Sequence, residues 1–81
     1  MWVRTYHSNE DKRHLINLEH YAQIHLNQTA DPNLCHIVAS VAGDTTRHLA
    51  DTTPEHARKI MNALSAALMD NRGFIDLNTI S

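Results

Sequence analysis

The segment that decides the fold is residues 53–73, which read TPEHARKIMNALSAALMDNRG. Its apolar residues recur at the three- and four-residue spacing of one helix face, and this stripe comprises Ala57, Ile60, Met61, Leu64, Ala67 and Leu68. Thr53 is a good N-cap and Pro54 suits the first helical position, while Thr52 and Glu55 offer a capping box one residue earlier. Gly73 can adopt the left-handed conformation that follows a last helical turn. The segment therefore predicts one amphipathic helix near the C-terminus.

The chain before this helix has the patterns of β-strands. Aromatic, β-branched or alternating apolar residues predict strands over residues 2–6, 15–18, 21–28, 35–42 and 46–50. The connection at Gly43-Asp44 leaves two registers open. A two-residue turn places Leu49 on the face of Val38, whereas a three-residue loop with a bulge at Gly43 places it beside Ile37. We prefer the bulge, because it brings Leu49 to the core.

Together these elements predict an α+β fold in one domain, residues 1–81. An antiparallel meander of four or five strands is expected, covered on one face by a single C-terminal amphipathic helix, which makes a two-layer sandwich. Residues 74–77, FIDL, are too short to assign, and we expect them to dock on the sheet or on a neighbouring subunit.

One stretch resembles a known group of proteins. Residues 15–24, LINLEHYAQI, are similar to the x-I-N-L-[DE]-x-[VYA]-x-x-I segment of small uncharacterised bacterial proteins. In those proteins a strand meander precedes a single helix, and residues 49–52, LADT, with residues 55–57, EHA, correspond to the junction. The resemblance implies a small meander-plus-helix fold, similar to a reduced pleckstrin-homology-like module. It implies no activity and no site residue.

The composition disfavours several classes of function. Seven Lys and Arg against nine Asp and Glu give a formal net charge of −2, without the basic stripe of a nucleic-acid binder. No apolar run approaches the ~18 residues that cross a bilayer, and the first residues, MWVRTYH, lack the apolar region of a secretory signal. We therefore expect a cytoplasmic protein with neither nucleic acid nor membrane as a partner.

The seven histidines are the unusual feature: His7, His14, His20, His25, His36, His48 and His56. None has the spacing of a known ligand motif. His25, His36 and His48 are predicted on the polar face of three successive strands, where side chains on neighbouring strands lie within ~8 Å of one another. They form a candidate site for a divalent metal, the one cofactor that the sequence suggests. The alternative is a solvated or pH-responsive sheet surface.

The residues give no constellation for catalysis. Cys35 and His36 are neighbours on a predicted strand, so their side chains point to opposite faces. No serine lies in a G-x-S-x-G elbow, and Gly43 and Gly73 form no phosphate-binding loop. Glu19 and Asp51 are candidate general acids or bases, but no spacing pairs them. We expect no enzymatic activity.

The helix is rich in alanine, so its apolar face is wider than a thin sheet covers. Ala63, Ala66, Met69, Phe74 and Ile75 are the candidate interface residues, and the core of the single chain is the alternative place for Ala63, Ala66 and Met69. The function favoured at this stage is a non-enzymatic interaction module, a homo-oligomer that binds an unidentified protein. One alternative is a small metal- or ligand-binding protein that uses the histidine face, and another is a phage- or plasmid-type inhibitor of a host protein.

Overall fold

The fold is α+β, with six strands and one C-terminal helix, in a computed structural model that describes residues 1–41 and 46–81. The strands are β1 (Trp2–Arg4), β2 (Leu15–Asn17), β3 (Gln23–Gln28), β4 (Cys35–Ser40), β5 (Thr46–Thr52) and β6 (Phe74–Asp76). The helix is α1 (Pro54–Met69), and three short 3-10 helices are η1 (Glu10–Lys12), η2 (Leu18–His20) and η3 (Leu77–Thr79). Within the described residues no helix has the length and apolar character needed to cross a membrane.

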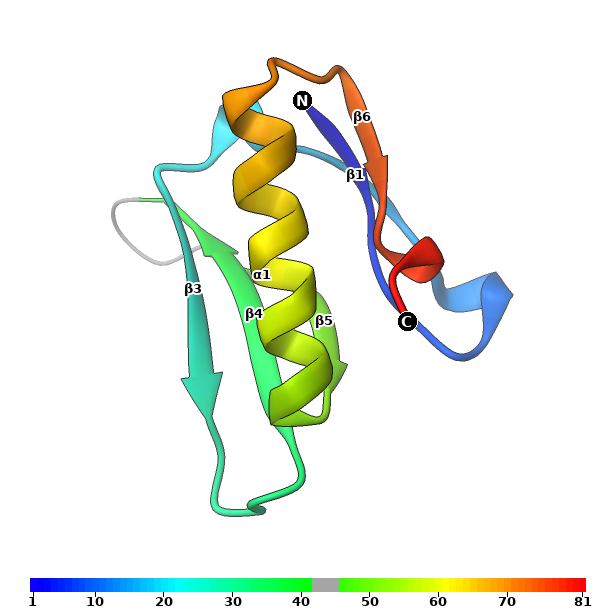
Figure 1. The fold of residues 1–81 in the computed structure, drawn as a ribbon, viewed down its shortest axis with the longest axis vertical. Helices are drawn as coiled ribbons and strands as arrows, with labels where there is room; N and C mark the ends of the chain where they lie inside the picture. Colours follow the sequence, from blue (N-terminus) through cyan, green and yellow to red (C-terminus); the bar gives the residue numbers. More distant parts are fainter. Residues whose placement is uncertain (42–45) are drawn as a thin grey trace.

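The strands form two sheets of three. The meander sheet has the order β3-β4-β5 and is antiparallel throughout, and α1 lies across one of its faces (Figure 1). The terminal sheet has the order β2-β1-β6, in which β1 pairs antiparallel with β2 and parallel with β6. The expected fold class and covering helix are confirmed. The strands divide in two because η2 turns the chain between β2 and β3, so these strands do not pair.

The core lies where the helix and the two sheets meet. Its largest fully buried side chains are Val3, Cys35, Ile37, Leu49, Ile60, Leu64 and Leu77. The helix contributes Ala57, Ile60, Leu64 and Ala67 to this core. Leu68, at the edge of the predicted stripe, is half exposed instead. The terminal sheet contributes Val3 and Ile75, which are paired neighbours on its inner face.

Both ends of α1 have the hydrogen bonds that stop a helix. The Thr53 side chain accepts a hydrogen bond from the His56 backbone N–H, which confirms Thr53 as the N-cap. At the other end Asn71, with φ 53°, takes the left-handed conformation that was expected of Gly73. The backbone N–H of Arg72 donates to the Ala67 carbonyl at 3.0 Å and that of Asn71 to the Leu68 carbonyl at 3.2 Å. These two bonds define a Schellman motif centred on Asn71.

A β-bulge interrupts the pairing of β4 with β5. Ile37 pairs with Ala50 and Val38 pairs with His48, so Leu49 is an extra residue on β5. Leu49 reaches the core together with Ile37 as expected, by means of this bulge. The bulge and tight connection predicted at Gly43-Asp44 lie outside the described residues.

Candidate metal centre

Two of the three candidate metal ligands, His36 and His48, lie on the outer face of the meander sheet, opposite α1. His36 is in β4 and pairs across the ladder with Asp51 of β5. His48 is in β5 and pairs with Val38, two residues along β4 from His36. Because residues two apart on a strand share a face, His36 and Val38 face the same way and bring their partners to that side.

The bulge at Leu49 places Asp51 on this face as well. In a regular strand, side chains three residues apart point to opposite faces, so His48 and Asp51 would be separated by the sheet. One extra residue restores them to the same face and lets both Leu49 and Ala50 turn to the core. The apolar residues Leu49 and Ala50 thus face the core, while the polar residues on either side, His48 and Asp51, face outward.

Asp51 holds both imidazole rings through one oxygen. Its Oδ1 lies 2.5 Å from Nδ1 of His36 and 2.8 Å from Nδ1 of His48. The two rings meet edge to face, with centroids 4.8 Å apart and planes at 62°. An ionised carboxylate only accepts hydrogen bonds, so each ring donates through Nδ1. We call these three residues the His–Asp cluster.

The cluster also stabilises the ionised form of Asp51. Partial burial by itself raises the pKa of this carboxyl group. The hydrogen bonds from His48 and His36, together with their favourable charge interactions, outweigh that effect and lower the pKa of Asp51 below its ordinary value of 3.8. Asp51 is therefore a carboxylate at neutral pH, which is the form that binds a cation.

The cluster has the composition of a transition-metal site. One ligand atom from each residue lies within 4.8 Å of the others, and no other such group of three is found among the described residues. Ligand atoms on a tetrahedral ion with bonds of about 2.0–2.1 Å are roughly 3.3 Å apart. An ion would thus replace the two short hydrogen bonds and move the side chains apart by about 0.5–0.8 Å. His36 is 28% exposed, and His48 and Asp51 are half exposed, so this movement meets little packing.

His25, the third predicted ligand, is not part of the cluster. It pairs with Val38 from the other side, so the buried Val38 side chain lies between the His25 and His48 positions. Nδ1 of His25 is buried without a hydrogen-bond partner. His25 therefore lies on the same face of the sheet as the cluster, but it is too far from the cluster to bind the same ion.

The candidate interface residues have different environments. Met69 is 84% exposed and Phe74 is 46% exposed. Ala66 is exposed, whereas Ala63 is partly buried against the core. Ile75 is only 7% exposed, because its side chain is on the inner face of β6. Ile75 is thus a core residue of the single chain, and the exposed part of the set is Ala66, Met69 and Phe74.

Asp51 is the site residue that simple strand alternation does not find. Its signal is the buried doublet Leu49-Ala50 between two polar residues, His48 and Asp51. Two adjacent buried residues in an otherwise alternating strand indicate a bulge, and a bulge changes which side chains share a face. Applied to residues 46–52, this rule places His48 and Asp51 together.

The chain matches no protein-family model, no curated protein and no solved structure in comparisons with known proteins.

Proposed function

We propose that the protein binds a divalent transition metal through His36, His48 and Asp51. The observation that carries the proposal is the meeting of two imidazole nitrogens on one carboxylate oxygen, at 2.5 Å and 2.8 Å. Imidazole suits Zn²⁺, Ni²⁺ and Cu²⁺, and three protein ligands leave further coordination positions open. Binding displaces ring protons, so the affinity for metal decreases as the pH falls.

The test is isothermal titration of the tag-free protein with Zn²⁺ and with Ni²⁺. We expect one ion per chain. His36→Ala and His48→Ala should each weaken binding by about tenfold or more, the scale on which changes around a metal site act. His25→Ala is the matched control, since His25 is on the same face of the same sheet but outside the cluster. No uptake by the natural sequence, or equal losses in all three variants, would refute the proposal.

Asp51→Asn separates two roles of the carboxylate. The amide oxygen of asparagine still accepts a hydrogen bond from an imidazole N–H, but it has no negative charge for the ion. If Asp51 is a ligand, the variant loses affinity on the same scale as His48→Ala. If Asp51 only orients the rings, the variant binds nearly as well as the natural sequence.

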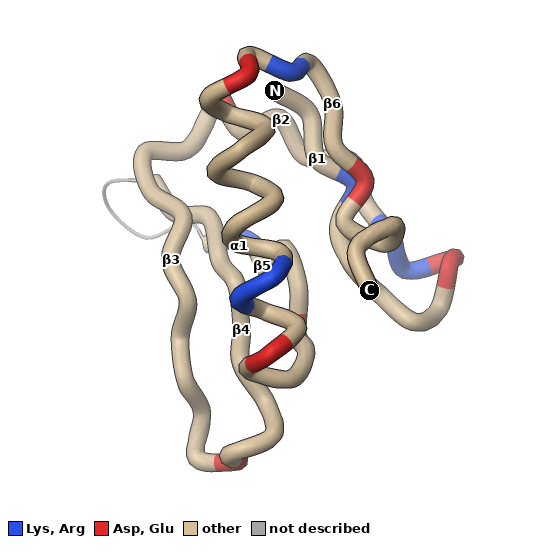
Figure 2. The backbone as a smooth tube through the Cα atoms, in the orientation of Figure 1, with Lys and Arg blue, Asp and Glu red and all other residues tan. Residues whose placement is uncertain are grey.

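Self-association through β3 is a second candidate function, favoured by the character of that strand. β3 is an edge strand of the meander sheet, on the side away from the terminal sheet (Figure 1). It has no charged residue from Gln23 to Gln28, as Figure 2 shows, whereas exposed edges are commonly protected by charges. Beside it a hollow of about 350 Å³ is lined by apolar residues of β3 and α1, among them Ile24, Met61 and Leu68.

In this second proposal two copies pair their β3 strands antiparallel about a two-fold axis. Light scattering at several hundred micromolar should then give the mass of a dimer. Gln23→Lys combined with Asn27→Lys should give a monomer, because an axis near His25 sets the new lysines opposite each other. If the natural sequence has the mass of a monomer under these conditions, self-association through β3 is refuted. Substituting His25, His36 and His48 together separates the two functions, since self-association survives if the histidines serve only the metal.

We also propose that the protein is cytoplasmic. Its one cysteine, Cys35, is free and buried in the core. A reducing compartment keeps a thiol in this form.

A further inference from the structure

The His–Asp cluster opens onto two neighbouring surface hollows that share His14 and His48 in their walls. The loop hollow, of about 280 Å³, lies between the segment after β1 and strand β5, and its walls include Lys12 and Asp51. The strand hollow, of about 670 Å³, lies between β2 and the start of β5, and its walls include Arg47. An ion held by His48 and Asp51 would therefore face the open space of the loop hollow.

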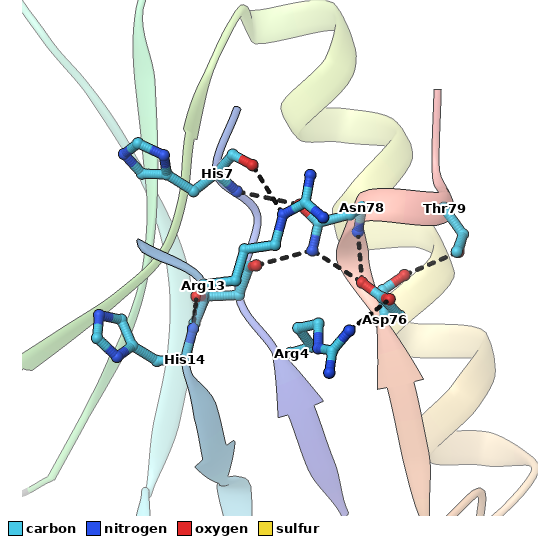
Figure 3. Close-up of polar contacts among 8 residues, drawn as sticks. Arg4, His7, Arg13, His14, Asp76, Asn78 and Thr79 are labelled. Atoms are coloured by element: carbon cyan, nitrogen blue, oxygen red, sulfur yellow. Dashed lines mark hydrogen bonds and ion pairs between the residues drawn. The ribbon is translucent and has the colours of Figure 1, made fainter. Parts of the chain in front are cut away.

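The backbone of the segment after β1 is fixed by Asn78 of η3. The His7 backbone N–H donates to Asn78 Oδ1 at 3.1 Å, and Asn78 Nδ2 donates to the Thr5 carbonyl at 2.9 Å. The Thr5 hydroxyl accepts from the His14 backbone N–H at 2.9 Å. As a result the imidazole rings of His7 and His14 project to the same side of this network, away from Arg4 and Asp76 (Figure 3). Both residues line the loop hollow.

The walls of the two hollows favour a negative ligand, although the chain as a whole has a net charge of −2. Lys12 stands in one hollow and Arg47 in the other. Across the described part of the chain, Asp51 is the one acidic residue in either wall. A divalent ion on Asp51 reverses that negative charge and leaves the neighbourhood positive.

We propose that the metal bound by the His–Asp cluster takes a small oxyanion, a carboxylate or a phosphate, as an exchangeable ligand from these hollows. The inference rests on the proposed metal binding and names the class of molecule that this site receives. One oxygen of the anion occupies an open coordination position. Lys12 binds a second oxygen from the wall of the loop hollow, which it shares with His48 and Asp51, and His14 offers an N–H donor from the same wall.

The test uses Co²⁺, whose visible absorption changes when a ligand enters its coordination shell. The Co²⁺-loaded protein is titrated with acetate in one experiment and with inorganic phosphate in another, at constant ionic strength set with a non-coordinating salt. We expect a saturable spectral change with at least one anion. The experiment that gives the tighter constant identifies which oxyanion chemistry the site prefers.

A pair of matched variants separates a built site from general attraction of anions. Lys12→Gln should raise the dissociation constant of the anion by about three- to tenfold, the scale of one charge-assisted contact at an exposed position. Lys59→Gln removes the same charge from the exposed face of α1, outside both hollows, and should leave the constant unchanged. Both variants should bind Co²⁺ as the natural sequence does.

The outcomes distinguish failure of this inference from failure of the proposed function. If no Co²⁺ spectrum forms, metal binding itself fails and the inference fails with it. If Co²⁺ binds but neither anion changes the spectrum at millimolar concentration, the metal site stands and the inference is overturned. Equal weakening in Lys12→Gln and Lys59→Gln also overturns it, because the anion then responds only to net charge.

Discussion

At the scale of single residues, Asn71 bears a backbone conformation that glycine adopts at lower cost. Its φ of 53° lies in the left-handed region, which asparagine tolerates better than most residues but glycine tolerates best. Asn71→Gly should therefore raise the free energy of unfolding by about 0.5–1 kcal/mol, measured by urea denaturation.

The neighbouring Arg72→Gly gives the control, since Arg72 has no positive φ and the change there loosens the unfolded chain without relieving strain. That variant should be less stable than the natural sequence. If Asn71→Gly also lowers the free energy of unfolding, then the left-handed conformation of Asn71 does not cost stability in the natural sequence.

Asp76, the N-cap of η3, makes the stability of the protein depend on pH. Partial burial alone raises the pKa of its carboxyl group, but hydrogen bonds from the side chain and backbone of Asn78, with the charges of Arg4 and Arg13, lower this pKa below 3.8. A lowered folded-state pKa stabilises the protein fully above the unfolded value, and the contribution is lost as the pH falls through the folded value. The natural sequence should therefore lose stability between about pH 5 and pH 2.

Asp76→Asn isolates this charge, because asparagine caps the turn at η3 as well as aspartate does. At neutral pH the variant should be less stable by about 0.5–1 kcal/mol, and the difference should vanish toward pH 2. Parallel urea denaturation of both proteins across this range measures it. Asp11→Asn, an exposed acid of η1, is the control and should keep the acid dependence. A constant offset at every pH would contradict the role of the charge.

At the scale of elements, α1 is the part of the fold that local sequence determines most fully. Its stripe and its N-cap both depend on residues close together in the chain, so periodicity and capping preferences suffice to predict them. The sequence predicts the left-handed residue after α1 two positions too late, at Gly73 instead of Asn71. Glycine is the usual left-handed residue, but the two bonds from Asn71 and Arg72 close the helix before Gly73 is reached.

The N-cap gives the prediction at this scale. Thr53→Ala leaves the His56 backbone N–H without its 3.3 Å partner and should cost about 1 kcal/mol of stability. Ser65→Ala, on the exposed side of α1, is the matched control and should be neutral or stabilising by a few tenths of a kcal/mol. Thermal denaturation followed by circular dichroism compares them. Equal melting temperatures for the two variants would show that the cap contributes nothing.

Strand β5 shows where sequence reasoning stops. The strand itself, its apolar Leu49 and the outward direction of His48 follow from composition and alternation. The pairing of His48 with Asp51 does not, because it requires one extra residue at a particular position in the ladder. That position is decided by which residues the core of α1 and β4 accepts, namely Leu49 and Ala50 together. Two of the three cluster residues therefore follow from strand alternation, and the third requires the bulge that the doublet Leu49-Ala50 indicates.

At the scale of the whole molecule, the division into two sheets depends on contacts between the ends of the chain. β1 lies between β2 and β6, and its pairing with β6 joins Trp2 to Phe74. A segment of three residues carries too little pattern to reveal a parallel partner more than 70 residues away, so residues 74–77 were predicted only to dock. The terminal sheet nevertheless matters for the candidate site, because η3 follows β6 directly and Asn78 fixes the segment that lines the loop hollow.

The metal site should act on the stability of the whole chain, because it joins β4 to β5 on the side of the sheet that α1 does not cover. At a free ion concentration a hundred times the dissociation constant, binding to the folded state alone adds about 2.7 kcal/mol. For a domain of this size that corresponds to a rise in melting temperature of roughly 10–20 °C. Differential scanning calorimetry with Zn²⁺ or Ni²⁺ measures the rise, and a chelator should reverse it. His25→Ala should keep the rise, whereas the double variant His36→Ala with His48→Ala should lose it.

The size of that rise also tests whether folding assembles the site. The unfolded chain presents all seven histidines to the ion, and any binding there subtracts from the stabilisation. A full rise means that only the folded arrangement of β4 and the bulged β5 brings His36, His48 and Asp51 within reach of one ion. An unchanged melting temperature, with calorimetric uptake still present at 25 °C, would mean that the histidines bind metal as independent side chains. The bulge would then have no part in forming a metal centre.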